Sequence, residues 1–373
     1  LPFMIGGAAF YFGTALRPQS FRHSKPRRFQ MKEFSAESQL AKFNNYMKGF
    51  KAVHLINIGQ KLGILEALRE AKNGISAQEL AFSLGLHEPY LKIWCRTAYC
   101  FEILDCDDQG HYRFQPYFEE VLGEESSLNY RGGAANLAVN VTGERLIGSL
   151  DYYRSGEINE SYTKERSEIV SDSTRVLHRH IGFYLSAMLP RDDPIRQKMS
   201  SDAQFIDIGC GCGELVIHLA QLFKNSNFVG VDPVRYSIEA GSKKIQELGL
   251  EDRITLKKIG GEKIPYRDEF DIASMVVTFH EIPPDIRDKV VSKAYQSLKE
   301  EGKLFLVDFS YPEVLSDFRN PAYEPGVIDQ FDETCLGVVH LSVREQDEML
   351  TKTGFKDIQR ISVQGMDILS ATK

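Results

Sequence analysis

The sequence predicts an α/β domain with a mostly parallel sheet, preceded by a mainly helical domain that contains a winged helix. Two patterns carry this prediction. From residue 203 onward, short apolar runs alternate with segments of helical length, as in parallel strands joined by crossover helices. Between residues 76 and 114, a helix, a turn, a second helix and a hairpin signal follow one another. A chain of 373 residues is long enough to form two separate cores.

We divide the chain into four segments. Residues 1–33 are predicted to be a non-catalytic extension, because their apolar part precedes the basic part and is too short to span a bilayer. A membrane-surface or targeting role is the alternative for them. Residues 34–125 form the winged-helix domain, and residues 126–200 form a helical linker that either roofs a pocket or only connects. Residues 201–373 form the α/β domain.

The first helical stretch of the chain is unusually apolar. Between Ala52 and Leu68 there are too many apolar residues for a helix with one buried face, so this segment packs in a core or against a partner chain. From this apolar segment we predict a homodimer formed through the N-terminal domain.

Ser76 and Glu79 form a capping box that opens the next short helix, and Gly85 follows its end.

The winged helix raises DNA binding as a competing function. A second helix is expected over residues 88–101, and a hairpin around the turn 107–110. The formal net charge of −7 argues against nucleic acid as a partner, as does a second helix whose face carries more apolar than basic groups. We therefore assign this domain to packing and dimerisation, and expect neither a nucleic-acid nor a membrane partner.

The six cysteines indicate neither disulfides nor a metal site. No CxxC pair occurs, and no cysteine is matched with histidines at the spacing of a zinc site. Cys210 and Cys212 lie in a glycine loop without other ligands nearby in the sequence. Reduced thiols of this kind are typical of a cytoplasmic enzyme, and we predict that no metal is bound.

Strands and helices alternate through the second domain. Its strands are expected at 204–208, 227–231, 254–258, 271–277, 303–309 and two later positions, one of them 357–363. Its helices are expected at 213–223, 234–248, 284–299 and 342–353. Because parallel sheets bind ligands at the carboxyl ends of their strands, the residues that follow each strand are the candidates for a site.

The first of these strands leads into a loop in which Gly209, Gly211 and Gly213 precede a helix. Glycines let a ligand approach the backbone closely, and the helix start offers unpaired N–H groups. Asp207, at the end of the strand, would repel a pyrophosphate but attract the ammonium group of an amino acid. Asp232, at the end of the next strand, suits the hydroxyl groups of a ribose. The pattern therefore favours S-adenosylmethionine over a nicotinamide dinucleotide.

These residues resemble the motifs of the class I S-adenosylmethionine-dependent methyltransferases. Asp207-x-Gly209-x-Gly211-x-Gly213 is similar to the first motif of that family, and Asp232 to its ribose-binding acid. Further matches follow in order, namely 261–265 with its third loop, 270–273 with its fourth strand and 298–304 with the approach to its fifth strand. Together with the winged helix, the chain from about residue 40 is similar to the two-domain small-molecule methyltransferases. Many of those are O-methyltransferases that dimerise through the N-terminal domain. The resemblance implies a Rossmann-like sheet of seven mostly parallel strands.

The resemblance and the spacing assign the cofactor-binding residues, which are Asp207, Gly209, Gly211, Gly213, Asp232, Pro233, Gly261, Glu262 and Thr278. One position departs from the family pattern. Gly260 stands where the third loop of the family usually carries an aspartate that contacts the adenine amine. Either backbone groups or Glu262 take over this contact, or the contact is weaker.

Methyl transfer to a hydroxyl needs alignment, a dry pocket and a base. His280 follows the fourth strand, and the ordinary histidine pKa of about 6.5 suits proton abstraction near neutrality. In the O-methyltransferases that the chain resembles, a histidine just after this strand acts as the base, although the surrounding motif differs. Glu281 is predicted to orient His280 or to line the pocket. A purely structural role for His280 is an alternative of equal weight.

Other residues near the same edge have two interpretations each. His178 and His180, on the helix that would roof the pocket, either touch substrate or pack in the protein. Asp308, at the end of the fifth strand, either faces the pocket or caps a loop. Four aromatic residues of an irregular, proline-containing stretch either shape an acceptor pocket or pack, namely Tyr311, Phe318, Tyr323 and Phe331.

The leading hypothesis for function is methyl transfer from S-adenosylmethionine to a small-molecule acceptor, with a hydroxyl as the methylated group. A second hypothesis keeps the fold and the cofactor but replaces transfer by a rearrangement or cyclisation that electrostatic preorganisation promotes. A third, a DNA-binding regulator that senses the cofactor, fits the acidic net charge less well.

Overall fold

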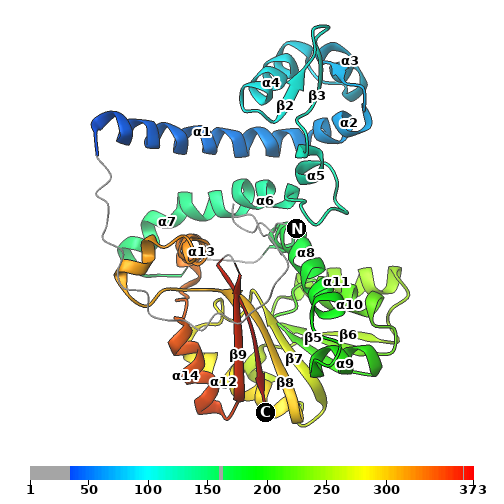
Figure 1. The fold of residues 1–373 in the computed structure, drawn as a ribbon, viewed down its shortest axis with the longest axis vertical. Coiled ribbons are helices and arrows are strands. Elements are labelled where there is room, and N and C mark those ends of the chain that lie inside the picture. Colours follow the sequence, from blue (N-terminus) through cyan, green and yellow to red (C-terminus); the bar gives the residue numbers. More distant parts are fainter. Residues whose placement is uncertain (1–33, 159–162, 364) are drawn as a thin grey trace. The chain divides into compact units, whose positions relative to one another are not determined.

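The computed structural model describes residues 34–158, 163–363 and 365–373. The extension predicted for residues 1–33 lies outside the described residues. The described chain falls into two compact units, residues 34–135 and 136–373 (Figure 1), and each is described by itself. Within these described ranges, none of the helices combines the length and the apolar character that crossing a membrane requires.

The first unit has the winged-helix arrangement that the sequence predicts. Its helices are α1 (Ala36–Lys61), α2 (Ile64–Glu70), α3 (Ala77–Leu84), α4 (Glu88–Cys100) and α5 (Phe118–Leu122). Its strands are β1 (Ile75–Ser76), β2 (Leu104–Cys106) and β3 (His111–Phe114), which form an antiparallel sheet in the order β1-β3-β2. The predicted capping box is present, because the Ser76 hydroxyl accepts from the Glu79 backbone N–H and the Glu79 carboxylate accepts from that of Ser76.

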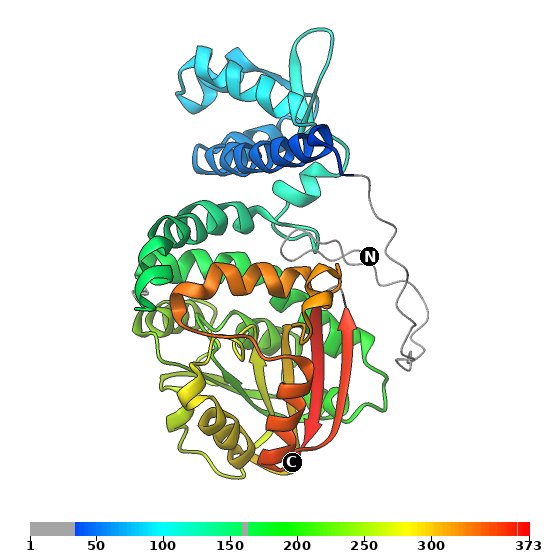
Figure 2. The same ribbon diagram turned by 90° about the vertical axis from the view of Figure 1, so that its left-hand side faces the viewer.

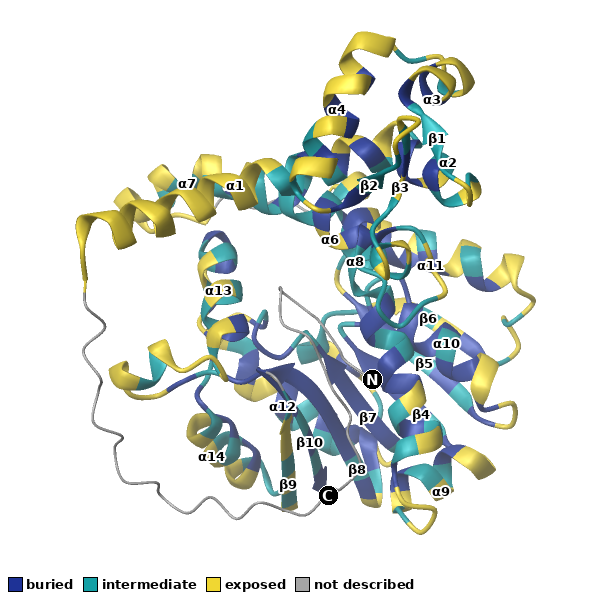
Figure 3. Ribbon diagram, turned by 45° about the horizontal axis from the view of Figure 1, so that its top comes forward, coloured by how far each residue is buried: buried dark blue, intermediate teal, exposed yellow. Residues whose placement is uncertain are grey.

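The core of the first unit lies between α2, α3 and α4, and α1 is attached to it by one end. Trp94 of α4 donates its indole N–H to the carbonyl of Leu55 in α1 at 2.9 Å. The N-terminal part of α1 is exposed to solvent (Figure 3). Large apolar side chains on that part of α1 face solvent in the single chain, namely Leu40, Phe43, Tyr46, Met47 and Phe50.

The second unit contains a seven-stranded sheet in the order β6-β5-β4-β7-β8-β10-β9, which confirms the predicted fold class. Only β10 runs antiparallel to its neighbours. The strands are β4 (Gln204–Ile208), β5 (Asn227–Asp232), β6 (Ile254–Lys258), β7 (Phe270–Val276), β8 (Leu298–Phe309), β9 (Lys356–Val363) and β10 (Met366–Thr372).

Helices cover both faces of this sheet and its carboxyl edge. The helices on one face are α9 (Pro194–Ser201), α10 (Glu214–Leu222) and α11 (Arg235–Glu247), and those on the other are α12 (Pro284–Ser297) and α14 (Val343–Thr353) (Figure 1). Over the ends of the parallel strands lie α7 (Gly143–Ser155), α8 (Lys164–Phe183) and α13 (Glu324–Asp332) (Figure 2). The short helix α6 (Gly132–Leu137) joins the two units, and short π-helical turns follow α6 and α8.

The structure corrects one expectation about the chain after β8. The stretch that the sequence analysis treats as irregular contains the helix α13 and, directly after it, the 3₁₀ turn Glu333–Leu336. Pro325 stands in the first turn of α13. At that position a proline fits a helix, because the N–H that it lacks would have no partner within the helix. The prolines therefore mark the start of an element and not its absence.

Candidate functional site

The glycine loop after β4 has a backbone that only glycine adopts without strain. Gly209, Gly211 and Gly213 have φ of +78°, +51° and +75°. A Cβ on Gly209 would collide with the side chain of Thr278, whereas a Cβ on Gly211 would meet nothing within 4 Å. The loop is thus closed against β7 on one side and open at Gly211. That open backbone, directly before the start of α10, suits a ligand that approaches closely.

Asp207 lies at the floor of this loop and is 3% exposed. One of its oxygens accepts a hydrogen bond from the Ser274 hydroxyl at 2.6 Å. Burial raises the pKa of Asp207 to about 7, and the nearby charge of Asp232 acts in the same direction. The carboxyl group is therefore poised to gain from a positively charged ligand near neutral pH.

Asp232, at the end of β5, ties the loop to the second strand. Its two oxygens accept from the backbone N–H groups of Gly211 at 3.0 Å and Val234 at 2.8 Å. Burial raises its pKa, although these two hydrogen bonds favour the ionised form. Because each carboxylate oxygen has more than one lone pair, both can still accept from ligand hydroxyls. Pro233 follows it and leads into α11.

The third predicted loop lies beside β6. Gly261 packs tightly, since a Cβ there would lie 2.8 Å from a methyl of Val290 in α12. The carboxylate of Glu262 folds back over Gly260 and pairs with Lys263 at 3.0 Å. Burial raises the pKa of Glu262, but the contact with Lys263 outweighs it and the pKa is lowered. A carboxylate thus stands over the position where the family carries its aspartate.

The chain turns sharply between β7 and α12. Val277 has φ of +48°, a left-handed conformation that is rare and strained for a β-branched residue. Its N–H remains bonded to the carbonyl of Val307 in β8 at 2.8 Å. Thr278 then bonds back through its hydroxyl to the carbonyls of Val276 at 3.0 Å and Gly209 at 3.3 Å. The strained turn brings the glycine loop and the residues after Thr278 to the same edge.

His280 lies directly behind this turn and is 5% exposed. Asp308, at the end of β8, accepts from the backbone N–H of His280 at 3.0 Å and from its Nδ1 at 2.5 Å. Arg287 of α12 donates to the carbonyls of His280 and Val339, both at 3.0 Å. These contacts fix the imidazole and aim Nε2 away from Asp308. Asp308 therefore holds the histidine, which combines the two interpretations left open for it.

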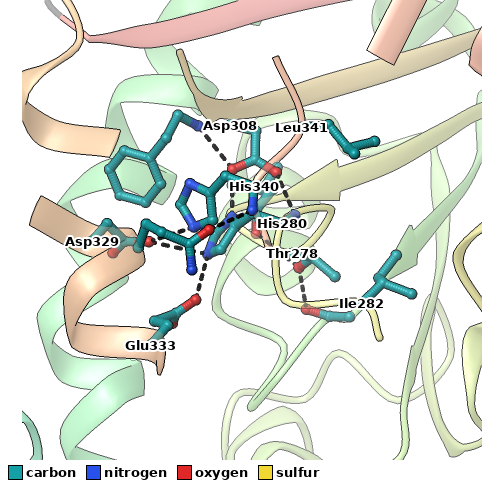
Figure 4. A network of polar contacts seen from close by, with 12 residues as sticks. Thr278, His280, Ile282, Asp308, Asp329, Glu333, His340 and Leu341 are labelled. Carbon is teal, nitrogen blue, oxygen red and sulfur yellow. Dashed lines mark hydrogen bonds and ion pairs between the residues drawn. The ribbon is translucent and has the colours of Figure 1, made fainter. Parts of the chain in front are cut away.

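The other nitrogen of His280 faces a group that sequence reasoning missed (Figure 4). Nε2 lies 3.3 Å from an oxygen of Glu333 and 3.5 Å from one of Asp329. The same Asp329 oxygen lies 3.2 Å from Nε2 of His340. Asp329 and Glu333 are four residues apart across the end of α13, a spacing that places two side chains on one helical face. In the sequence, this spacing is the local indication that Asp329 and Glu333 act together. It is informative only if residues 324–332 are recognised as a helix.

The charges of this group are strongly coupled. Burial would lower the pKa of His280, but the attraction of Asp308 and Glu333 outweighs it and raises the pKa well above its ordinary value. Burial, reinforced by the negative charge of Glu333, raises the pKa of Glu281 well above its ordinary value. Glu281 is in hydrogen-bond contact with Glu333, and burial disfavours its charged form. The pKa of Asp308 is lowered, because His280 outweighs its burial.

The remaining candidates divide between packing and the site. Burial lowers the pKa of His178 to about 4, so this residue of α8 is neutral and packed. His180 is also buried. Tyr311 is the predicted aromatic residue that reaches the histidines, because its ring centroid lies 5.2 Å from that of His340 and 5.6 Å from that of Phe318.

Comparison with known proteins identifies the α/β unit. Residues 205–302 match a family described as a methyltransferase domain. Over 109 residues the chain is 32% identical to a demethylmenaquinone methyltransferase of Lactobacillus johnsonii, which covers 29% of this chain and 44% of that protein. The chain therefore spans less than half of the length of that relative. Over 207 residues it is 25% identical to a carboxy-S-adenosyl-L-methionine synthase of Nautilia profundicola, which covers 52% of this chain and 86% of that protein.

Solved structures extend the likeness to both units. Human N-acetylserotonin methyltransferase in complex with S-adenosylmethionine matches with a TM-score of 0.72 and 14% identity, over 92% of this chain and 99% of that chain. At that identity the match shows the fold alone. The predicted resemblance and the predicted fold class are confirmed. S-adenosylmethionine is the cofactor of the methyltransferase domain at residues 205–302.

Proposed function

Since the chain carries a methyltransferase domain of the class I S-adenosylmethionine-dependent fold, we propose that it transfers a methyl group from S-adenosylmethionine to a small-molecule acceptor. The observation that carries this proposal is the arrangement of two buried carboxylates, Asp207 and Asp232, on either side of an open glycine loop. The cofactor supplies an electrophilic methyl group when it is bound. What the protein contributes is alignment and exclusion of water.

The two carboxylates take different parts of the cofactor in this proposal. Asp232 accepts from the ribose hydroxyls while its present hydrogen bond from Gly211 keeps the loop in place. Asp207 attracts the ammonium group of the methionine moiety, which compensates the cost of keeping its charge buried. Glu262 takes the place of the missing aspartate at Gly260 and faces the adenine amine. Thr278 closes the loop against β7.

For the acceptor we propose a small molecule with a hydroxyl group and an aromatic or polyketide-like body. The support is the position of His280 at the edge of the sheet and the aromatic pair Tyr311 and Phe318 next to His340. In this proposal Nε2 of His280 removes the hydroxyl proton, while the Nδ1–H group of His280 stays hydrogen-bonded to Asp308. The reactive tautomer is thereby defined by Asp308.

The carboxylates set a condition on this role of His280. An imidazolium ion cannot accept a proton, and Glu333 and Asp329 favour that charged form. General-base catalysis therefore requires that the negative charge facing Nε2 is neutralised when the acceptor binds.

Replacing Asp232 by alanine tests the cofactor site. The ribose then loses a charged acceptor and the loop loses the bond to Gly211, so we expect cofactor affinity to fall by about 10- to 100-fold. Calorimetric titration with S-adenosylmethionine measures it. Asp252→Ala removes an exposed carboxylate of the same unit and is the matched control. Unchanged affinity in Asp232→Ala would sink the assignment of this residue.

Replacing His280 by alanine tests the catalytic part. We expect turnover to fall by about 10²- to 10⁴-fold, while the dissociation constant of the cofactor changes little. The assay follows label from the cofactor methyl group into a panel of hydroxylated aromatic compounds. His87→Ala, which removes an exposed histidine of the first unit, should leave both quantities unchanged. Equal turnover in both variants would exclude His280 from the reaction.

A second candidate function keeps the cofactor and omits methyl transfer. It is favoured by the likeness to a carboxy-S-adenosyl-L-methionine synthase, whose name describes a reaction other than methylation. Mass spectrometry separates the two proposals. A product heavier than its precursor by one methylene unit supports methyl transfer, whereas a rearranged product of unchanged mass, formed only in the presence of the cofactor, supports the alternative.

We also propose that the protein works as a homodimer in the cytoplasm. The support for the dimer is the stripe of exposed apolar residues on α1, which a second copy of the chain would cover. The support for the location is that none of the six cysteines, all of which are described, forms a disulfide.

A further inference from the structure

Four side chains that sequence analysis did not connect meet behind the cofactor loop. His280, Asp329, Glu333 and His340 each present one nitrogen or oxygen atom, and these four atoms lie within 4.8 Å of one another. They come from the turn after β7, from α13, from the 3₁₀ turn that follows it and from the segment before α14. Figure 4 shows Asp329, Glu333 and His340 around His280.

Three of the six separations among these atoms match those of ligands around one ion, and all six are at most 4.8 Å. The three close pairs, His280 with Glu333, His280 with Asp329, and His340 with Asp329, lie 3.3, 3.5 and 3.2 Å apart. Strong hydrogen bonds between charged groups are shorter, about 2.7–2.9 Å. Two ligands at about 2.0–2.1 Å from a tetrahedral zinc ion are about 3.3–3.4 Å apart, because the edge of a tetrahedron is about 1.6 times the bond length.

Several of these atoms have no hydrogen-bond partner although they are buried. They are Asp329 Oδ2, Glu333 Oε2 and both ring nitrogens of His340. His340 is 3% exposed and Glu333 is 6% exposed, so water does not satisfy them from outside. Unpartnered buried polar atoms are costly. A cation in the cluster would be bound by Asp329 Oδ2, by Glu333 Oε2 and by Nε2 of His340, the ring nitrogen that faces Asp329.

The surrounding contacts resemble the second shell of a metal site. A histidine that binds a metal through one nitrogen usually donates its other N–H to a carboxylate. His280 does so, because its Nδ1 lies 2.5 Å from Asp308. The backbone N–H of His340 is held by the side-chain oxygen of Gln330 at 2.6 Å. The imidazole of His280 is therefore fixed through Nδ1, which leaves Nε2 facing Asp329, while Gln330 holds the backbone of His340.

We propose that His280, Asp329, Glu333 and His340 bind one divalent transition-metal ion. Two imidazoles and two carboxylates form a mixed nitrogen and oxygen set that suits Zn²⁺, Fe²⁺ or Mn²⁺. Mg²⁺ and Ca²⁺ prefer oxygen ligands alone and are disfavoured. The charge of the ion balances the negative charges of Asp329 and Glu333. The proposal departs from the sequence-based expectation that the protein binds no metal, which rested on the spacing of cysteines and histidines.

The ion would add a further role to the proposed function. Its placement beside the reaction rests on the cofactor site that is proposed above. His280 is two residues beyond Thr278, whose hydroxyl contacts the cofactor loop at Gly209. An ion held there would act as a Lewis acid and would lower the pKa of an acceptor hydroxyl that joined it as a fifth ligand. The ion and the general-base role require the same lone pair on His280 Nε2. Metal binding therefore assigns His280 as a ligand, and its absence leaves His280 free to act as a base.

Metal titration of the purified full-length chain tests the proposal. After treatment with a chelator and dialysis, the protein is titrated with ZnCl₂, MnCl₂ and MgCl₂ in a calorimeter, and bound metal is counted by elemental analysis. We expect one Zn²⁺ or Mn²⁺ per chain and much weaker binding of Mg²⁺. Titration with Co²⁺ should produce visible absorption bands of a site with nitrogen and oxygen ligands.

Matched variants locate the site. His340→Ala and the nearly isosteric Glu333→Gln should each weaken Zn²⁺ binding about 100-fold or more, and Asp308→Asn, which acts through His280, about 10- to 100-fold. His87→Ala should bind as the parent does. Circular dichroism and the affinity for S-adenosylmethionine, measured on the metal-free protein, report folding and the cofactor site separately. Absence of stoichiometric Zn²⁺ or Mn²⁺ binding, or equal binding by Glu333→Gln, would overturn the metal site without affecting the proposed cofactor site.

Discussion

Asp207 is the buried side chain proposed to link the protein to its cofactor. Ser274 donates to it and Asp232 lies nearby, and burial makes the carboxylate costly to keep ionised. Its pKa of about 7 in the folded protein exceeds the ordinary aspartate pKa of about 3.9, so the folded protein holds the proton more tightly than the unfolded chain. This raised pKa makes stability fall as pH rises from about 4 to 7, by up to about 4 kcal/mol in total. A ligand that carries positive charge offsets that loss.

Cofactor binding is therefore expected to depend on pH through Asp207. Lowering the pH from 7 to 6 protonates this residue, and a neutral carboxyl group no longer attracts the ammonium group. If only the ionised form binds well, the dissociation constant of S-adenosylmethionine rises about fivefold over this interval. Calorimetry at both pH values, in buffers of different ionisation enthalpy, measures the affinity and the proton released.

Asp207→Asn is the control for this pH dependence. It keeps the shape of the side chain and its contact with Ser274, but it cannot ionise. Its affinity should be weaker than that of the parent at pH 7 and nearly constant down to pH 6. A variant that retained the parent's pH profile would show that another group titrates.

At the scale of elements, the end of β7 decides how the two parts of the site are joined. The strand itself is buried and regular, with Ser274 below Asp207 and Val276 paired with Val307. At Val277 the backbone enters the left-handed region, and the chain folds back over the sheet edge. The cost of that conformation for a β-branched residue is about 1–3 kcal/mol. Bonds from the residues on either side keep the turn in place.

Two glycine substitutions separate strain from packing at this turn. Val277→Gly loses side-chain contacts and makes the unfolded chain more flexible, but it relieves the left-handed strain, so stability should change by less than about 1 kcal/mol. Val276→Gly has no strain to relieve and loses a buried side chain, so it should cost about 3 kcal/mol. Urea denaturation of the two variants measures the difference. Equal losses in both would mean that the Val277 turn is not strained.

At the scale of the whole molecule, the important feature is the apolar surface that α1 exposes. A protein that works as a monomer is not expected to keep such a surface in contact with water. Phe43 and Phe50 are exposed by 57% and 62%, and they lie seven residues apart, two helical turns along one face. Leu40 and Met47 belong to the same stripe. A stripe that runs along a helix is suited to pairing with its copy around a twofold axis.

The double substitution Phe43→Ser and Phe50→Ser should convert a dimer into a monomer. Light scattering of the parent should give twice the mass of one chain, and the variant should give the mass of one chain. Leu315→Ser, which changes an isolated side chain that is 86% exposed, is the control and should remain dimeric. A monomeric parent would remove the need for a partner on α1.

Sequence patterns predicted the fold well because strands and glycine loops are encoded locally. The parallel strands, the capping box at Ser76 and the positive φ of the loop glycines all follow from short stretches of sequence. The cluster around His280 could not be found in this way. Its members are separated by up to 60 positions in the chain, and two of them depend on a helix that begins with a proline. A local pattern records which residues are neighbours in sequence, whereas a ligand set depends on tertiary contacts.

The position of α13 in the chain has an evolutionary consequence. The residues proposed to face the cofactor lie on or directly after β4, β5, β6 and β7, whereas Tyr311, Asp329, Glu333 and His340 all lie on the single segment between β8 and α14. Mutations in that segment leave the glycine loop untouched. The choice of acceptor can therefore drift or be exchanged by recombination of one stretch of chain, while the machinery for the methyl donor is inherited unchanged.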